Sequence, residues 1–190
     1  MVDKDSFAER GRALEDEYFR KRDRELIEKM RKVTEAEETR AGLSAKTGLT
    51  DPALVQQLQE LGFTPDTVVL LPLVPLVQMA WAEGGVTASE RALVLKLARS
   101  RGIAEGSAAD QQLLDWLETR PSDTVFARAT RLIAAMLDAS PAAAGMTADE
   151  LVGYCESIAE ASGGFFGINR VGADEKAILA SLAQGLKARK

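Results

Sequence analysis

Signals that start and stop α-helices recur along the chain after residue 50. Thr87 and Thr147 are each followed three residues later by a glutamate, which is the spacing of a capping box. Gly102 and the pair Gly163-Gly164 stand where the helices that begin at these caps should end. No window shows a convincing period-two alternation of apolar and polar residues, the pattern of a half-buried strand. The sequence therefore predicts an all-α protein.

The predicted bundle contains one long apolar segment, residues 68–82. It is shorter than the roughly 20 residues that a membrane-spanning helix needs, and Pro72, Pro75 and Gln78 interrupt it. We expect a buried core helix whose first turns are strained or broken by the prolines. With a long N-terminal helix, the signals predict a bundle of about eight helices. After the N-terminal helix, the expected ranges are 52–61, 64–83, 87–101, 107–119, 124–139, 147–162 and 173–188.

The N-terminal helix is predicted from a highly charged run, EDEYFRKRDRELIEKMRK, with neither glycine nor proline between residues 13 and 33. An acidic residue four positions before a basic one stabilises a helix by roughly 0.2–0.5 kcal/mol. The pairs with this spacing are Asp16/Arg20, Glu17/Lys21, Glu25/Lys29 and Glu28/Lys32. We therefore expect one long helix that is stable enough to exist partly outside a core.

Large apolar residues form two strips on this helix. At 100° per residue, Phe7, Leu14 and Tyr18 fall on one strip. The second strip, rotated by roughly 100°, consists of Phe19, Leu26, Met30 and Val33. Two interpretations stay open. The helix binds in a partner's cleft and touches two walls, or it has one wide apolar face that packs on its own bundle.

The composition changes from charged to small and polar between residues 34 and 48, where Gly42 and Gly48 would loosen a helix. We therefore expect a charged N-terminal arm over residues 1–40, a linker over residues 41–49 and a helical bundle over residues 50–190. A core built from residues 50–190 is ample for an independent domain.

Composition and charge argue against several classes of function. The chain has no histidine, phosphate-binding glycine loop or nucleophile elbow, so an enzyme is not expected. The formal net charge of -5 argues against nucleic-acid binding, which needs a basic face. The single cysteine, Cys155, and a polar start without a visible signal peptide favour a soluble, cytoplasmic protein without a transmembrane segment.

An internal repeat links two parts of the bundle. GVTASERALVLKLA, residues 85–98, aligns without gaps on RVGADEKAILASLA, residues 170–183. Each copy follows an apolar helix and a glycine-containing turn, and Glu90 and Glu175 are each placed to bond back to their own helix start. We expect two related helix–turn–helix pairs that pack face to face and bury their apolar sides.

The first of these pairs, LVQMAWAEGGVTASERALVLKLA, carries Ala80, Ala82-Glu83-Gly84, Thr87 and Glu90. On these residues, roughly residues 66–188 resemble the TerB-like helical family of tellurite-resistance proteins, which also precedes the J domain of DjlA-type co-chaperones. Glu83 stands where that family commonly has aspartate, and the second copy lacks the acidic residue of the turn. The resemblance implies a stress-linked, non-catalytic bundle.

The same resemblance implies a metal-responsive function. Carried over by position, the acidic candidates for a divalent cation are Glu83, Glu90, Asp174 and Glu175. A hard cation such as calcium takes about six to eight oxygen ligands, so two glutamates in one turn are too few to establish a site. Capping of their own helices is the alternative role of Glu90 and Glu175, and it is the one we favour. No other cofactor is expected.

The N-terminal helix combines a phenylalanine, arginine, an acidic stretch, Tyr-Phe-Arg, a further arginine and an acidic-leucine pair. In this chain these are Phe7, Arg10, Glu15, Glu17, Tyr18-Phe19-Arg20, Arg22 and Glu25-Leu26. The pattern resembles the inhibitory helix of the mitochondrial ATP synthase inhibitor family, which inserts into a cleft between catalytic subunits of the rotary motor. The glycine-rich lead-in, the histidines and the dimerising coiled coil of that family are missing here.

The sequence thus predicts a non-enzymatic, stress-related regulatory protein that presents its N-terminal helix to a protein partner. Inhibition of a rotary ATPase is the sharper form of this hypothesis, and a metal-responsive sensor is the alternative. The residues expected to contact the partner are Phe7, Leu14, Glu17, Tyr18, Phe19, Arg20, Arg22, Leu26 and Met30. The identity of the partner and the oligomeric state stay open.

Overall fold

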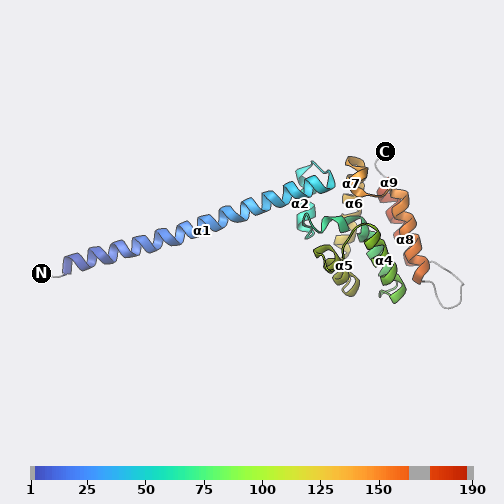
Figure 1. Cartoon of the computed structure of the whole chain (residues 1–190), viewed down its shortest axis with the longest axis horizontal. Helices are drawn as coiled ribbons and strands as arrows, with labels where there is room; N and C mark the ends of the chain where they lie inside the picture. Colours follow the sequence, from blue (N-terminus) through green and yellow to red (C-terminus); the bar gives the residue numbers. More distant parts are fainter. Residues whose placement is uncertain (1–2, 163–171, 188–190) are drawn as a thin grey trace. The chain divides into compact units, whose positions relative to one another are not determined.

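The computed structural model describes residues 3–162 and 172–187, and the side chains of residues 17–161 and 172–186. Every regular element in these ranges is helical, which confirms the predicted all-α fold (Figure 1). The elements are α1 (Asp3–Thr47), α2 (Pro52–Glu60), the 3-10 helix η1 (Val68–Leu73), α3 (Val74–Ala80), α4 (Ala88–Ser100), α5 (Ala108–Glu118), α6 (Asp123–Ala139), α7 (Pro141–Ala144), α8 (Ala148–Ser162) and α9 (Ala173–Lys187).

The chain divides into two units, residues 1–39 and residues 40–190, and the boundary lies inside α1. The linker predicted over residues 41–49 is therefore wrong for residues 41–47, which are the last turns of this helix. Tertiary packing overrides the low helix propensity of Gly42. Leu43 and Thr47 are fully buried, and the Thr47 hydroxyl donates to the Leu43 carbonyl at 2.7 Å. Gly48, at φ 72°, follows the helix as a left-handed residue.

The core of the second unit surrounds α3, which packs against α4, α6, α8 and α9. The apolar segment is broken by its prolines, as predicted. Pro72 lies inside the 3-10 helix η1, and Pro75 lies in the first turn of α3. Leu70, Leu71 and Leu73 are completely buried. Within the described residues, no helix is both long and apolar enough to cross a membrane.

The two predicted helix–turn–helix pairs are α3 with α4 and α8 with α9. The pairs pack against each other, because α8 contacts both α3 and α4, and α9 contacts α3 (Figure 1). This arrangement buries Met79, Val94, Ile158 and Leu182 from the four helices. Residues 163–171 lie outside the described residues, so most of the turn of the second pair is not described.

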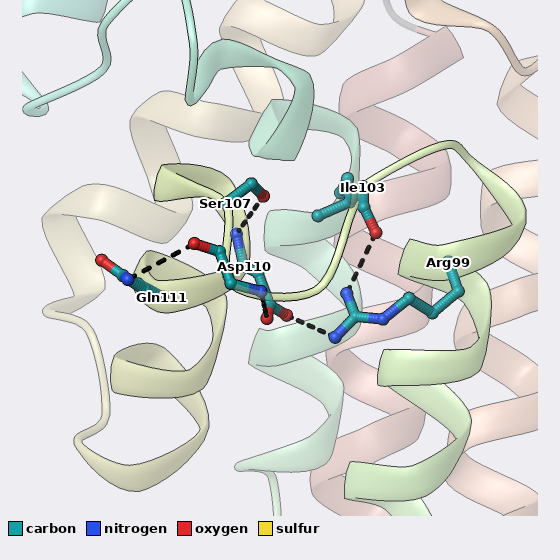
Figure 2. Close-up of polar contacts among 6 residues, drawn as sticks. Arg99, Ile103, Ser107, Asp110 and Gln111 are labelled. Atoms are coloured by element: carbon teal, nitrogen blue, oxygen red, sulfur yellow. Dashed lines mark hydrogen bonds and ion pairs between the residues drawn. The ribbon is translucent and has the colours of Figure 1, made fainter.

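The loop between α4 and α5 is held by a buried carboxylate (Figure 2). Asp110 is only 2% exposed, and its Oδ1 accepts from Arg99 Nη2 at 2.6 Å while its Oδ2 accepts from the Gly106 N–H at 2.8 Å. Arg99 also donates to the Ile103 carbonyl at 3.1 Å, and the Asp110 N–H donates to the Ser107 hydroxyl at 3.2 Å. These bonds explain an acidic group in the interior, and they stabilise the loop.

Candidate functional site

Exposed apolar side chains gather on the N-terminal part of α1. Those that are more than half exposed are Tyr18, Phe19, Leu26, Ile27, Met30 and Val33, from 51% at Val33 to 64% at Ile27. Among the other described side chains, Val69 is the only large apolar one that is exposed, at 41%. Contiguous exposed apolar surface is typical of interaction sites. Of the N-terminal arm predicted over residues 1–40, we use the word arm from here on only for residues 17–33 of α1.

The aromatic pair of the arm has a defined geometry. The Tyr18 and Phe19 rings meet edge to face, with centroids 5.8 Å apart and planes at 73°. Arg22, one turn further along the helix, donates from Nη1 to the Tyr18 hydroxyl at 3.0 Å. Edge-to-face contact is a favourable arrangement for aromatic rings. The two rings therefore present a joined apolar surface whose polar hydroxyl is already hydrogen-bonded.

Two ion pairs form within the part of α1 whose side chains are described. Glu28 pairs with Lys32 at 2.9 Å as predicted, and Arg31 pairs with Glu35 at 2.7 Å in the reverse order. Exposed charges gain little from direct contact in water, so side chains at the favoured spacing need not meet. The predicted pairs that do not form ion pairs are Glu17/Lys21 and Glu25/Lys29, while the side chain of Asp16 lies outside the described residues.

The structure places all of the predicted partner-contacting residues on one helix. Glu17, Arg20 and Arg22 are exposed beside the aromatic pair, and Arg24 donates to the Arg20 carbonyl at 3.1 Å. Phe7 and Leu14 belong to α1, but their side chains lie outside the described residues.

Ile27 was missed by the sequence reasoning because it falls off both apolar strips. A large aliphatic residue in a run of charges was the signal that could have identified it. Its 64% exposure makes it a further candidate contact of the arm.

Glu90 forms the capping box that the sequence predicts. Its Oε2 accepts from both the Thr87 N–H and the Thr87 hydroxyl at 2.7 Å, and its own N–H donates to Thr87 Oγ1 at 3.3 Å. The side chain is only 2% exposed. Because both donors belong to the helix start, the capping role explains a buried glutamate at this position.

Glu175 makes the matching contact in the second pair, although glycine replaces threonine at the cap. Its Oε2 accepts from the Gly172 N–H at 2.6 Å, and the residue is 1% exposed. Glu83 approaches the same turn, since a Cβ at Gly172 would lie 3.4 Å from Glu83 Oε1 and from Glu175 Oε2. Asp174 is exposed. In the described part of the chain, no group of three or more Asp, Glu, His or Cys residues could hold a metal ion.

The cysteine is also explained by packing. Cys155 lies in α8 with no exposed surface, and burial raises the pKa of its thiol to about 12. A thiol with such a pKa is protonated at neutral pH and is a poor nucleophile or metal ligand.

Comparison of the chain with models of protein families, with curated proteins and with solved structures gives no match. The two family resemblances therefore stay predictions from the sequence. The function is therefore inferred from the residues themselves, and the exposed apolar side chains of the arm are the strongest indication of it.

Proposed function

We propose that this protein is a non-enzymatic interaction protein whose arm binds a protein partner. The observation that supports this function is the concentration of exposed apolar side chains between Tyr18 and Val33. None of the described side chains from residue 17 to residue 39 is buried. Exposed apolar surface of this kind is typical of a site that binds another protein.

Burial of the arm contributes part of the binding free energy of a complex. Full burial of a fully exposed large apolar side chain contributes about 1.5–3 kcal/mol, and Tyr18, Phe19 and Leu26, which are 55–59% exposed, retain roughly half of that gain each. Association itself costs at least about 4 kcal/mol in lost translational and rotational freedom. Because the arm is already helical, less ordering is needed on binding than for a disordered peptide. Tyr18 and Phe19 are thus the expected anchors of the contact.

A rotary ATPase is the first partner to test, because the arm resembles the inhibitory helix of the ATP synthase inhibitor family. The partner's surface would be an apolar cleft with two walls and charged edges, which suits strips rotated by roughly 100° on one helix. The TerB-like relationship of roughly residues 66–188, and with it a stress-related, cytoplasmic function, is part of the same proposal. The capping contacts of Glu90 and Glu175 are compatible with it.

The direct experiment measures ATP hydrolysis by a purified rotary ATPase with increasing amounts of the full chain. We expect inhibition, and we expect Tyr18→Ala with Phe19→Ala to weaken it at least about tenfold, since the two rings together contribute about 1.5–3 kcal/mol. The matched control is Arg31→Ala with Glu35→Ala, which removes an exposed ion pair from the same helix and leaves the rings in place. It should change inhibition by less than about threefold.

Two results would count against this proposal in different ways. No inhibition by the unaltered chain would remove the ATPase as the partner and leave the arm's general role to be tested by capture of partners. Equal inhibition by both double variants would show that the aromatic pair is not the contact.

A metal-responsive sensor is the second candidate, and its support is the approach of Glu83 and Glu175 to one turn. It has less support than the arm because Glu90 and Glu175 each use a carboxylate oxygen to bind their own helix start. It predicts that calcium raises the melting temperature of the full chain and that Glu83→Gln removes the rise. A flat calorimetric titration of the unaltered chain with calcium would reject it.

A further inference from the structure

A cavity of about 420 Å³ opens on the second unit, where the end of α1, η1, α6 and α7 meet. Pockets of about 300–1,000 Å³ are typical of sites for small molecules. Its apolar wall includes Val68, Pro72, Met136 and Ala144, all of which are buried. Val69 adds an apolar side chain that is 41% exposed. Outside the arm, this is the single large apolar side chain in the described residues with so much exposure, so the cavity offers apolar surface to a ligand.

Arg101 brings an incompletely satisfied cation to this cavity. Its Nη2 donates to the Ala144 carbonyl at 2.6 Å, and no ion pair with a described residue accompanies this bond. Its Nε is buried and has no hydrogen-bond partner in the described residues. A guanidinium carries five N–H donors, so most of its capacity is unused here.

Burial of Arg101 disfavours its charged form, and a bound anion would offset this cost. Burial lowers the pKa of Arg101, while Tyr154 and Glu150 act in the opposite direction. Glu150 uses its Oε2 to accept from Thr147 in the capping box of α8, and it makes no ion pair with Arg101. A partly desolvated guanidinium without an ion-pair partner gains from an incoming carboxylate.

Two further charged residues, one basic and one acidic, line the cavity. Lys46, from the last turn of α1, and Asp66 are both exposed, and neither is in an ion pair with a described residue. Among the residues that line the cavity, Arg101 and Lys46 against Asp66 give one net positive charge beside an apolar wall. The charge of Glu150, which acts on Arg101 without lining the cavity, offsets part of it. This combination suits a ligand with one negative charge and an apolar body, and it is less suited to a free phosphate, which has no apolar part.

We propose that this cavity binds a small monocarboxylate with an apolar chain. The carboxylate contacts Arg101, whose planar fork matches a carboxylate in two parallel hydrogen bonds. The apolar chain of the ligand lies along Val69, Pro72 and Met136. This site belongs to the unit of residues 40–190, and it does not depend on the function of the arm.

Titration of the full chain with octanoate, followed by amide chemical shifts in NMR, tests this site. We expect saturable shifts centred on residues 65–72 and 143–145. Octan-1-ol, which lacks the charge, and acetate, which lacks the chain, should each bind at least about tenfold more weakly. No saturable shift with octanoate, or equal binding of octan-1-ol, would overturn the proposal.

Variants at two positions identify the contact. Arg101→Gln should weaken octanoate binding at least about tenfold. Arg101 also donates a hydrogen bond to the Ala144 carbonyl, so its replacement could weaken binding by disturbing the fold. A second position, Val69, provides a test that does not remove this hydrogen bond. Val69→Asp places a carboxylate at an exposed position of the wall, and Val69→Asn is its neutral match. We expect Val69→Asp to bind octanoate at least about fivefold more weakly than Val69→Asn. Equal binding by these two variants, or unchanged binding by Arg101→Gln, would contradict a charge-selected site.

Discussion

Asp110 and Glu90 are buried carboxylates that accept hydrogen bonds from residues close to them in the sequence. Asp110 stabilises the loop before α5, and Glu90 caps the start of α4. A buried carboxylate without such partners would be costly, because burial disfavours its charged form. At this scale the acidic residues of the interior stabilise local structure, and their roles can be tested by stability measurements.

Asp110→Asn should lower the free energy of unfolding by about 2 kcal/mol. The change removes a charge-assisted hydrogen bond from Arg99 and weakens the bond from the Gly106 N–H. Urea denaturation at neutral pH measures the effect. The control is Asp115→Asn, a change of the same chemistry at an exposed position of the same helix that has no ion pair in the described residues. It should change stability by less than about 0.5 kcal/mol.

The contribution of Asp110 should also depend on pH. The Gly106 N–H first, and Arg99 second, lower the pKa of Asp110 in the folded protein. The folded state therefore releases this proton more readily than the unfolded chain, whose aspartate titrates near about pH 4. The stabilisation is fully present above this pH and is lost as the pH falls through the lower pKa of the folded state. Urea midpoints of the unaltered chain and of Asp110→Asn should converge below about pH 4, and a constant difference down to pH 2 would contradict the assignment.

At the scale of elements, cap residues determined most of what the sequence could predict. Thr87 with Glu90 and Thr147 with Glu150 form the expected boxes, because these contacts join residues three positions apart. The helix α7, Pro141–Ala144, was missed although Ser140 and Pro141 are a cap and a first-turn proline. A single turn leaves too short a pattern to recognise.

The end of α1 could not be predicted from local signals. Gly42 and Gly48 indicated a linker, but Leu43 and Thr47 pack into the core and keep the chain helical to residue 47. The deciding contacts are with residues distant in sequence, such as Pro65, and helix propensity carries no information about them. The same limit applies to the cavity beside Arg101, whose wall joins segments from residue 46 to residue 145.

Gly42→Val should destabilise the second unit by about 1–3 kcal/mol. A Cβ at position 42 would lie 2.6 Å from Cγ of Pro65, so the proline ring or the helix must move. Ala41→Val, at the neighbouring exposed position of α1, introduces the same β-branched side chain without this contact. Thermal unfolding of both variants measures the effect. Equal melting temperatures for the two variants would show that the close approach of Gly42 to Pro65 does not matter for stability.

At the scale of the whole molecule, the two units differ in how they use apolar residues. The described buried apolar side chains begin at Leu43 and belong to residues 40–190, while the arm carries those that are most exposed. A bundle with its own core does not need these side chains for its interior. This contrast supports the proposal that the arm serves binding, and packing of the arm on its own bundle is the rival explanation to exclude.

Hydrogen exchange separates these two explanations. If the arm is free in the isolated protein, amides of residues 17–33 should exchange at similar rates in the full chain and in a peptide of residues 1–39, because neither has tertiary packing over the arm. Protection at least about a hundredfold stronger in the full chain would show that the arm is docked on the bundle.

Capture of partners from extracts of the cells that make this protein, read by quantitative mass spectrometry, tests the central claim most directly. The baits are the full chain, Tyr18→Ala with Phe19→Ala, and Arg31→Ala with Glu35→Ala. We expect the full chain and the ion-pair variant to capture the same partner in similar amounts. The aromatic variant should capture at least about tenfold less of it. Retention of the same proteins by all three baits would contradict a binding function of the arm.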